Sequence, residues 1–86
     1  MTITATVIPN GFRFTGSGFT VDVTSDQRWF TVYDTSGEPC GTIERPAVIG
    51  GSRHWSSYLP NGEPCTKTAV GPRSAFRSFI IAYTNR

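Results

Sequence analysis

The chain contains no run of the roughly 18 consecutive apolar residues that a membrane-spanning segment requires. Its first residues, Met1 to Ile8, lack the basic stretch and the apolar core of a secretory signal. We therefore expect a cytoplasmic protein with no membrane partner. Two cysteines in 86 residues do not form a disulfide scaffold and are compatible with reduced thiols in that compartment.

Charge is also scarce, at 16% of the residues and a net charge of +2, which is too small to predict a partner. The two halves of the chain nevertheless differ. From Met1 to Pro46 there are three basic and five acidic residues, whereas from Ala47 onward there are five basic residues and one acidic residue. A basic second half would suit phosphate groups or an acidic protein surface.

The groups that usually carry out catalysis are nearly absent. General acid–base chemistry near neutral pH most often uses histidine, and the only histidine is His54. A pairing of His54 with Cys40 or Cys65 lacks any recognisable nucleophile motif around either thiol. The segment Gly16 to Phe19 lacks the Lys-Ser/Thr and the helix of a phosphate-binding loop. We predict a non-enzymatic protein with no catalytic residues and no cofactor.

What the chain does contain is aromatic and β-branched residues, which predict one folded domain spanning residues 1–86 with a single modest core. N-terminal strands are expected over residues 1–27. Ile3 to Ile8 is predicted to form the first strand and ends at the turn sequence Pro9-Asn10-Gly11. Phe12 and Phe14 lead into Gly16-Ser17-Gly18, after which Phe19 to Thr24 alternates apolar and polar residues. This region predicts a second strand, continuous or interrupted at the glycine segment.

The tetrapeptide Gly-Glu-Pro-Cys occurs twice, starting at Gly37 and at Gly62. Each copy lies between two strand-like runs, so residues 28–70 are predicted to form two repeated hairpins. The four runs are Arg28 to Asp34, Pro39 to Arg45, Trp55 to Leu59, and Pro64 to Val70. In this interpretation Gly37 and Gly62 provide the positive φ of a tight turn.

Within the repeat, Cys40 and Cys65 are predicted to be equivalent strand residues with a structural role. A metal site formed by Cys40, His54 and Cys65 lacks closely spaced cysteine pairs and a fourth ligand, so we predict no metal. A disulfide between the two cysteines is geometrically possible if their strands are neighbours. In a reducing cytoplasm, small buried thiols are the more common outcome.

The last segment changes from strand to helix periodicity. An amphipathic helix is predicted over residues 72–83, with Gly71 at its cap and Pro72 in its first turn. Its apolar stripe has the spacing i, i+3, i+4 and i+7, formed by Phe76, Phe79, Ile80 and Tyr83. A lone sheet needs a cover for its apolar face. The predicted fold is therefore α+β, an antiparallel sheet built from hairpins and covered by one C-terminal helix.

The segments "WFTVYDTSGEPCGTIER", "HWSSYLPNGEPCTKT" and "SAFRSFIIAY" together resemble small accessory proteins of phages that infect actinobacteria. The resemblance covers about Arg28 to Tyr83 and leaves the first 27 residues unmatched. It implies an antiparallel sheet with a C-terminal helix and a phage protein working in a bacterial host cell. It implies no catalytic residue.

Our first hypothesis for function is that the protein binds a host or phage protein. Exposed tryptophan or tyrosine with a nearby arginine is the usual composition of a binding hot spot. The predicted protein-binding residues are Arg53, His54, Trp55 and Tyr58. A core position for Trp55 is the structural alternative.

The second hypothesis is binding of nucleic acid, namely DNA, through a sheet face. Basic residues of the second half would contact phosphates, which makes the affinity fall with salt. The predicted residues are Arg45, Arg53, Lys67, Arg73 and Arg77. The small net charge weighs against this hypothesis. A homodimer formed through the β-rich segment Thr2 to Ile8 is a further possibility.

Overall fold

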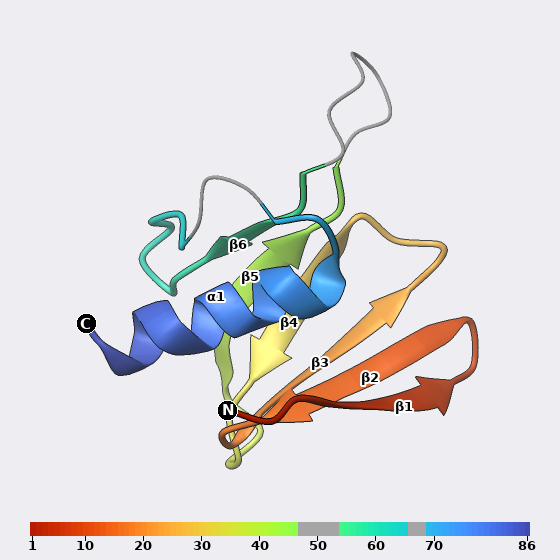
Figure 1. The fold of residues 1–86 in the computed structure, drawn as a ribbon, viewed down its shortest axis with the longest axis horizontal. Helices are drawn as coiled ribbons and strands as arrows, with labels where there is room; N and C mark the ends of the chain where they lie inside the picture. Colours follow the sequence, from red (N-terminus) through yellow and green to blue (C-terminus); the bar gives the residue numbers. More distant parts are fainter. Residues whose placement is uncertain (47–53, 66–68) are drawn as a thin grey trace.

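The structure is a computed structural model that describes residues 1–46, 54–65 and 69–86. These residues form one six-stranded antiparallel sheet in which the strands lie side by side in chain order, and a single helix packs on it (Figure 1). The predicted α+β fold is thus confirmed. The elements are β1 (Thr4–Ile8), β2 (Gly11–Gly16), β3 (Phe19–Thr24), β4 (Trp29–Tyr33), β5 (Pro39–Glu44), β6 (Ser56–Tyr58) and α1 (Pro72–Thr84).

The region predicted as a second, interrupted strand is instead the two-strand hairpin β2–β3. Gly16 pairs with Phe19 across a two-residue turn formed by Ser17 (φ 51°) and Gly18 (φ 87°). Two successive residues with positive φ make the turn whose twist matches a two-residue hairpin. The glycine-containing segment therefore reverses the chain and adds one more strand than the alternation alone indicated.

The repeated Gly-Glu-Pro-Cys sequence forms the same turn twice. Gly37 and Gly62 have φ values of 81° and 90°, as predicted. The N–H of Gly37 donates to the carbonyl of Asp34 at 3.0 Å, and the N–H of Gly62 donates to that of Leu59 at 2.9 Å. The two turns thus share both the positive φ of their glycine and the hydrogen bond that closes them.

The strands beyond these turns are less alike. In the first hairpin Tyr33 pairs with Pro39, and the register shifts between Tyr33 and Val32 at a bulge. From Val32 and Gly41 to Trp29 and Glu44, β4 and β5 then pair residue by residue. In the second, Tyr58 and Pro64 form the corresponding pair, but as an isolated bridge. The predicted returning strand, Pro64 to Val70, includes residues 66–68, which lie outside the described part of the chain.

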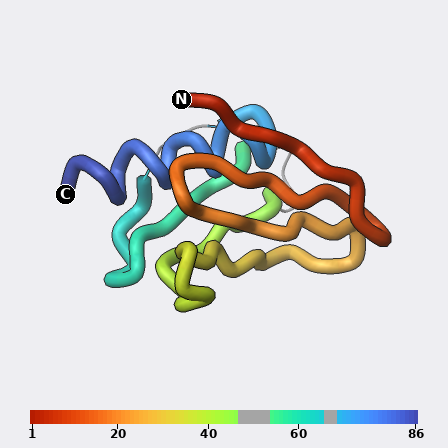
Figure 2. Tube along the Cα trace, turned by 90° about the horizontal axis from the view of Figure 1, so that it is seen from below, coloured from red at the N-terminus to blue at the C-terminus, as the bar shows by residue number. Residues whose placement is uncertain are grey.

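Helix α1 begins one residue after Gly71 and has Pro72 at its start, in agreement with the sequence pattern. It lies across one face of the sheet, which we call the covered face (Figures 1 and 2). Its residues Phe76, Phe79 and Ile80 are buried, and Tyr83 packs at the margin of the core. In the described residues, no helix has the length and apolarity needed to cross a membrane.

The core lies between α1 and the covered face, to which every strand from β2 to β5 contributes buried side chains. The sheet provides Phe14, Val21, Val23, Phe30, Val32, Cys40 and Ile43, and these pack against the apolar stripe of the helix. Because successive strand residues point to opposite sides, the residues between them face away from α1. We call that second side of the sheet the open face.

Candidate functional site

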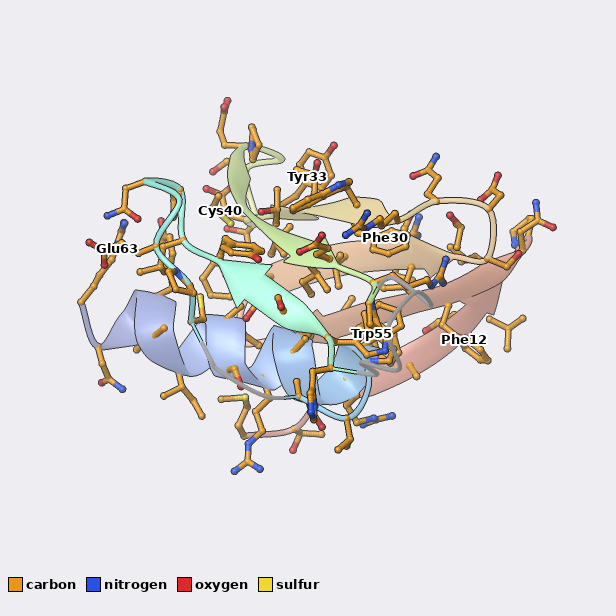
Figure 3. All side chains as sticks on the ribbon, turned by 90° about the horizontal axis from the view of Figure 1, so that it is seen from above. Phe12, Phe30, Tyr33, Cys40, Trp55 and Glu63 are labelled. Carbon is orange, nitrogen blue, oxygen red and sulfur yellow. The ribbon has the colours of Figure 1, made fainter. Side chains whose placement is uncertain are left out.

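The open face is the broad surface of the sheet that α1 leaves uncovered; in Figure 3 it lies on the opposite side of the sheet from the helix. On β4, Phe30 and Val32 are buried beneath the helix, and the alternating residues Trp29, Thr31 and Tyr33 point the other way. Threonines on neighbouring strands continue this surface. Thr20 lies opposite Tyr33, and Thr42 lies opposite both Thr31 and Tyr58.

Three aromatic side chains stand on the open face: Trp29, Tyr33 and Tyr58, which we call the open-face aromatics. Trp29 is 52% exposed and Tyr33 is 44% exposed, which is high for such large side chains. The rings of Trp29 and Tyr58 lie 5.9 Å apart between centroids. Tyr33 projects from the sheet on the side opposite the helix (Figure 3).

The charged groups on this face are paired with one another. Arg28 contacts the Glu44 carboxylate at 2.6 Å, and the Tyr58 hydroxyl donates to the other Glu44 oxygen at 3.1 Å. Across β2 and β3, the guanidinium of Arg13 donates twice to the carboxylate of Asp22, at 2.7 and 3.0 Å. The described part of the open face is therefore close to electrically neutral, and Glu44 links an arginine to one of the aromatics.

Two open hollows flank the outward side chain of Thr31. The larger, about 360 Å³, lies beside the tips of the two repeated hairpins and is lined by Thr31, Pro39, Gly41, Thr42, Leu59, Pro60 and Gly62. The smaller, about 240 Å³, is lined by Asp22, Gln27, Trp29, Phe30, Thr31 and Tyr33. A small-molecule site normally encloses most of its ligand. These wide-open hollows are better suited to a broad partner surface.

The predicted protein-binding residues do not form one surface. Tyr58 lies on the open face, whereas Trp55 packs against the core with its ring stacked at 6.3 Å from that of buried Phe30. The two side chains therefore point to opposite sides of the sheet. His54 is exposed, and Arg53 lies outside the described residues. The binding role of these residues stays a prediction.

Arg45, predicted to contact phosphate, makes several contacts inside the protein. Its guanidinium donates to the carbonyls of Thr24 (2.8 Å), Ser25 (3.3 Å) and Gln27. It also lies 5.3 Å from the ring centroids of both Phe30 and Trp55. Arg45 thus ties the β3–β4 connection to the end of β5 through three hydrogen bonds from its terminal guanidinium nitrogens to backbone oxygens.

Of the other predicted phosphate contacts, the two that the structure describes, Arg73 and Arg77, lie on α1, away from the open face. Arg73, on α1, donates to the carbonyl of Ile3 at 2.7 Å and stacks 5.8 Å from the Phe14 ring. Arg77, one turn further along the helix, is exposed. Arg53 and Lys67 belong to the segments that the structure does not describe. Within the described residues, these predicted contacts do not gather on a sheet face.

Cys40 and Cys65 are free thiols, the first buried and the second half-buried. Burial raises the pKa of the Cys40 thiol, with a further increase from the charge of Asp34 and an opposing effect of Arg86. Burial also raises the pKa of the Cys65 thiol, against a smaller lowering by the Ser57 side chain. Over residues 1–46, 54–65 and 69–86, no three His, Cys, Asp or Glu side chains gather as a metal site requires.

Sequence reasoning did not single out Trp29, Tyr33 or Glu44. The signal that was present is the repeat itself, because a shift of 25 positions places Tyr33 on Tyr58 and Phe30 on Trp55. Once Phe30 is recognised as a core residue, strand alternation directs Trp29 and Tyr33 to the opposite face. The partnership of Glu44 with Arg28 and Tyr58 depends on strand register, which the sequence pattern does not contain.

Comparison of the chain with models of known protein families, with curated proteins and with solved structures finds no match.

Proposed function

We propose that this chain is a non-enzymatic accessory protein of phage type that binds and modulates a host or phage protein in the bacterial cytoplasm. The phage context rests on the resemblance of residues 28–83. The observation that carries the binding proposal is the open face. Among residues 1–46, 54–65 and 69–86 no helix or strand covers this side of the sheet, and it presents Trp29, Tyr33 and Tyr58 together.

The composition of the open face matches what dominates protein interfaces. Tryptophan and tyrosine are the residues most often found as binding hot spots, since they bury large areas at a small cost in side-chain entropy. Around them the threonines Thr20, Thr31 and Thr42 supply small hydroxyl groups. The partner that this surface fits is a neutral, partly apolar protein surface.

The paired charges also favour a protein over DNA on this face. Arg13 and Arg28 are the basic residues of the described open face, and each already contacts a carboxylate. Binding of DNA through phosphate contacts requires unpaired cations and weakens steeply as salt is raised. Binding driven by the open-face aromatics changes little with salt, so the salt dependence of binding separates the two hypotheses.

The experiment is affinity capture from actinobacterial lysate, with and without nuclease, comparing the wild-type chain with the double variant Trp29→Ala/Tyr33→Ala. The matched control is Ile81→Ala, which truncates an exposed side chain on the helix, on the other side of the molecule. We expect a captured protein that survives nuclease and high salt, that the control retains and that the double variant loses. Capture that nuclease abolishes, or that the double variant leaves unchanged, contradicts the proposal.

A further inference from the structure

The two edge strands of the sheet, β1 and β6, differ in whether other backbone segments hydrogen-bond along their outer side. At the β6 edge, the N–H of Cys65 donates to the carbonyl of Ser57 at 2.7 Å, and the N–H of Trp55 donates to that of Ala69 at 2.8 Å. Pro64 also forms a bridge with Tyr58. The backbone of residues beyond β6 thus occupies the hydrogen-bonding positions along that edge. An edge covered in this way is protected against pairing with another chain.

The β1 edge has no such protection within the described residues. β1 is the outermost strand in Figures 1 and 2, and its residues Thr4–Ile8 carry neither charge nor proline. Lysine, proline, a bulge or a covering segment are the usual means of blocking an edge strand. A five-residue strand without any of them is a template for β-pairing.

The register of the β1–β2 hairpin identifies the backbone groups that point outward. Ile8 and Gly11 close the two-residue turn and form a hydrogen-bonded pair, and hydrogen-bonded pairs alternate along an antiparallel ladder. Thr6 and Thr4 therefore bond to β2. Ala5 and Val7 direct their N–H and C=O groups away from the sheet, where a further strand would lie.

The side chains at this edge are also apolar on the covered face. Val7 lies opposite Phe12, which lies opposite buried Val23, so these three side chains form one row across the sheet. Val7 is 76% exposed and Phe12 is 49% exposed. This end of the covered face projects beyond the cover that α1 provides (Figure 1). Burial of both side chains would be favourable.

We propose that two copies of this chain form a symmetric dimer in which their β1 strands pair antiparallel, with Thr6 on the two-fold axis. Ala5 of each copy then lies opposite Val7 of the other, and the two outward-pointing residues exchange four backbone hydrogen bonds in all. On the covered face, the row of Val23, Phe12 and Val7 continues into Ala5 and Phe14 of the second copy.

Neighbouring registers are less favourable for reasons visible in the structure. A shift by one pair in one direction brings in Ile3, whose carbonyl already accepts a hydrogen bond from Arg73. A shift in the other direction brings in Pro9, which has no N–H to donate. The register centred on Thr6 is the one in which every participating backbone group has a free partner.

This pairing closes after two copies. The two-fold axis uses the β1 edge of both chains, and the remaining edges are the covered β6 edges, so no further strand is added. Because the axis stands perpendicular to the sheet, both open faces lie on the same side. An interface formed by one five-residue strand from each copy is small compared with the roughly 1,600 Å² of a standard stable complex, so we expect a dissociation constant on the order of micromolar.

The first test is sedimentation velocity over about 10 µM to 1 mM protein. Val7→Lys and Val7→Glu place like charges diagonally across the axis, and each is expected to weaken dimerisation at least about tenfold. An equimolar mixture of the two variants should recover dimerisation, because the charges are then opposite. Ile81→Lys adds the same charge on the helix and should dimerise as the wild type does. A monomeric wild type, or dimerisation unchanged by Val7→Lys, overturns the proposal.

The second test is specific for the register. Thr6 and its symmetry mate form a non-hydrogen-bonded pair with Cα atoms about 4.5 Å apart, within the range of about 4.4–6.8 Å for disulfides. In a Cys65→Ser background, Thr6→Cys should give a covalent dimer on oxidation. Thr4→Cys should not, because Thr4 lies opposite Ile8. Equal cross-linking of both variants would refute this register, and neither test depends on the proposed binding partner.

Discussion

Replacement of Gly41 by alanine should be among the most damaging small changes to this fold. Gly41 lies on β5 where α1 crosses the sheet, and a Cβ atom at this position would lie 2.7 Å from the carbonyl oxygen of Tyr58. It would also lie 2.9 Å from Cδ1 of the buried Phe79 ring and closer still to Cε1. Carbon atoms do not approach their neighbours this closely without a shift of the structure.

The size of the stability loss depends on which atoms must shift to make room for the new Cβ. Overpacking of a well-packed core typically costs about 1–3 kcal/mol, and here one obstacle is backbone, which cannot rotate away. We therefore expect the free energy of unfolding to fall by about 3 kcal/mol. For a domain of this size, about 4–8 °C of Tm is lost per kcal/mol, which predicts a decrease in Tm of roughly 12–24 °C.

Urea and thermal unfolding followed by circular dichroism measure this loss. The control is Gly71→Ala, since a Cβ there meets no heavy atom within 4 Å and should cost less than about 1 kcal/mol even at the helix cap. A Phe79→Leu background removes the ring and should show a coupling energy of about 1 kcal/mol or more with Gly41→Ala. A loss below about 1 kcal/mol for Gly41→Ala alone would refute the packing argument.

Three further predictions concern Arg45, the repeated turns and the thiols. Arg45→Lys should lower the free energy of unfolding, measured by urea denaturation, by about 2 kcal/mol, because one ammonium cannot reach three carbonyls and stack on two rings. An unchanged urea midpoint would contradict a stabilising role for the Arg45 contacts. Gly37→Ala and Gly62→Ala should each cost about 1–2 kcal/mol, since both positions have positive φ, and a marked difference between them would count against equivalent turns. Burial raises the thiol pKa values of Cys40 and Cys65, so the thiols of the unfolded chain ionise first as pH rises above about 9, and the free energy of unfolding should fall there. The double variant Cys40→Ala/Cys65→Ala should lose less stability at alkaline pH than the wild type. An identical dependence of stability on pH in the two proteins would contradict this.

The features that sequence predicted well are those determined by local chemistry. Positive φ at Gly37 and Gly62 follows from the turn sequence, and the start of α1 after Gly71 follows from the cap and Pro72. The helix stripe was predicted because a period of 3.6 residues is distinct from that of the strands before it. Each of these signals lies within a few residues of the structure that it specifies.

The features that sequence predicted poorly depend on contacts between distant segments. The hydrogen bonds of Arg45 within the protein were not predicted, because its acceptors Thr24, Ser25 and Gln27 lie about 20 residues earlier in the chain. The sequence also did not show whether the Trp55 side chain lies on the covered face or on the open face. Its distance of three positions from Tyr58 already places the two side chains on opposite sides of a strand, and only the identity of the buried face was missing.

The repeat explains why one face is packed and the other is open. The two repeated hairpins differ on the covered face: the position of Val32 in the first is occupied by Ser57 in the second, and both residues are fully buried. Ser57 lies beside Ile43 and close to Gly41 on the neighbouring strand. Small residues at both sites let α1 approach β5 and β6, which is why the Phe79 ring fits over Gly41. The described residues place no helix on the open face, and there both copies keep their tyrosine. The covered face is thus shaped by the helix, whereas the equivalent tyrosines Tyr33 and Tyr58 both lie on the open face.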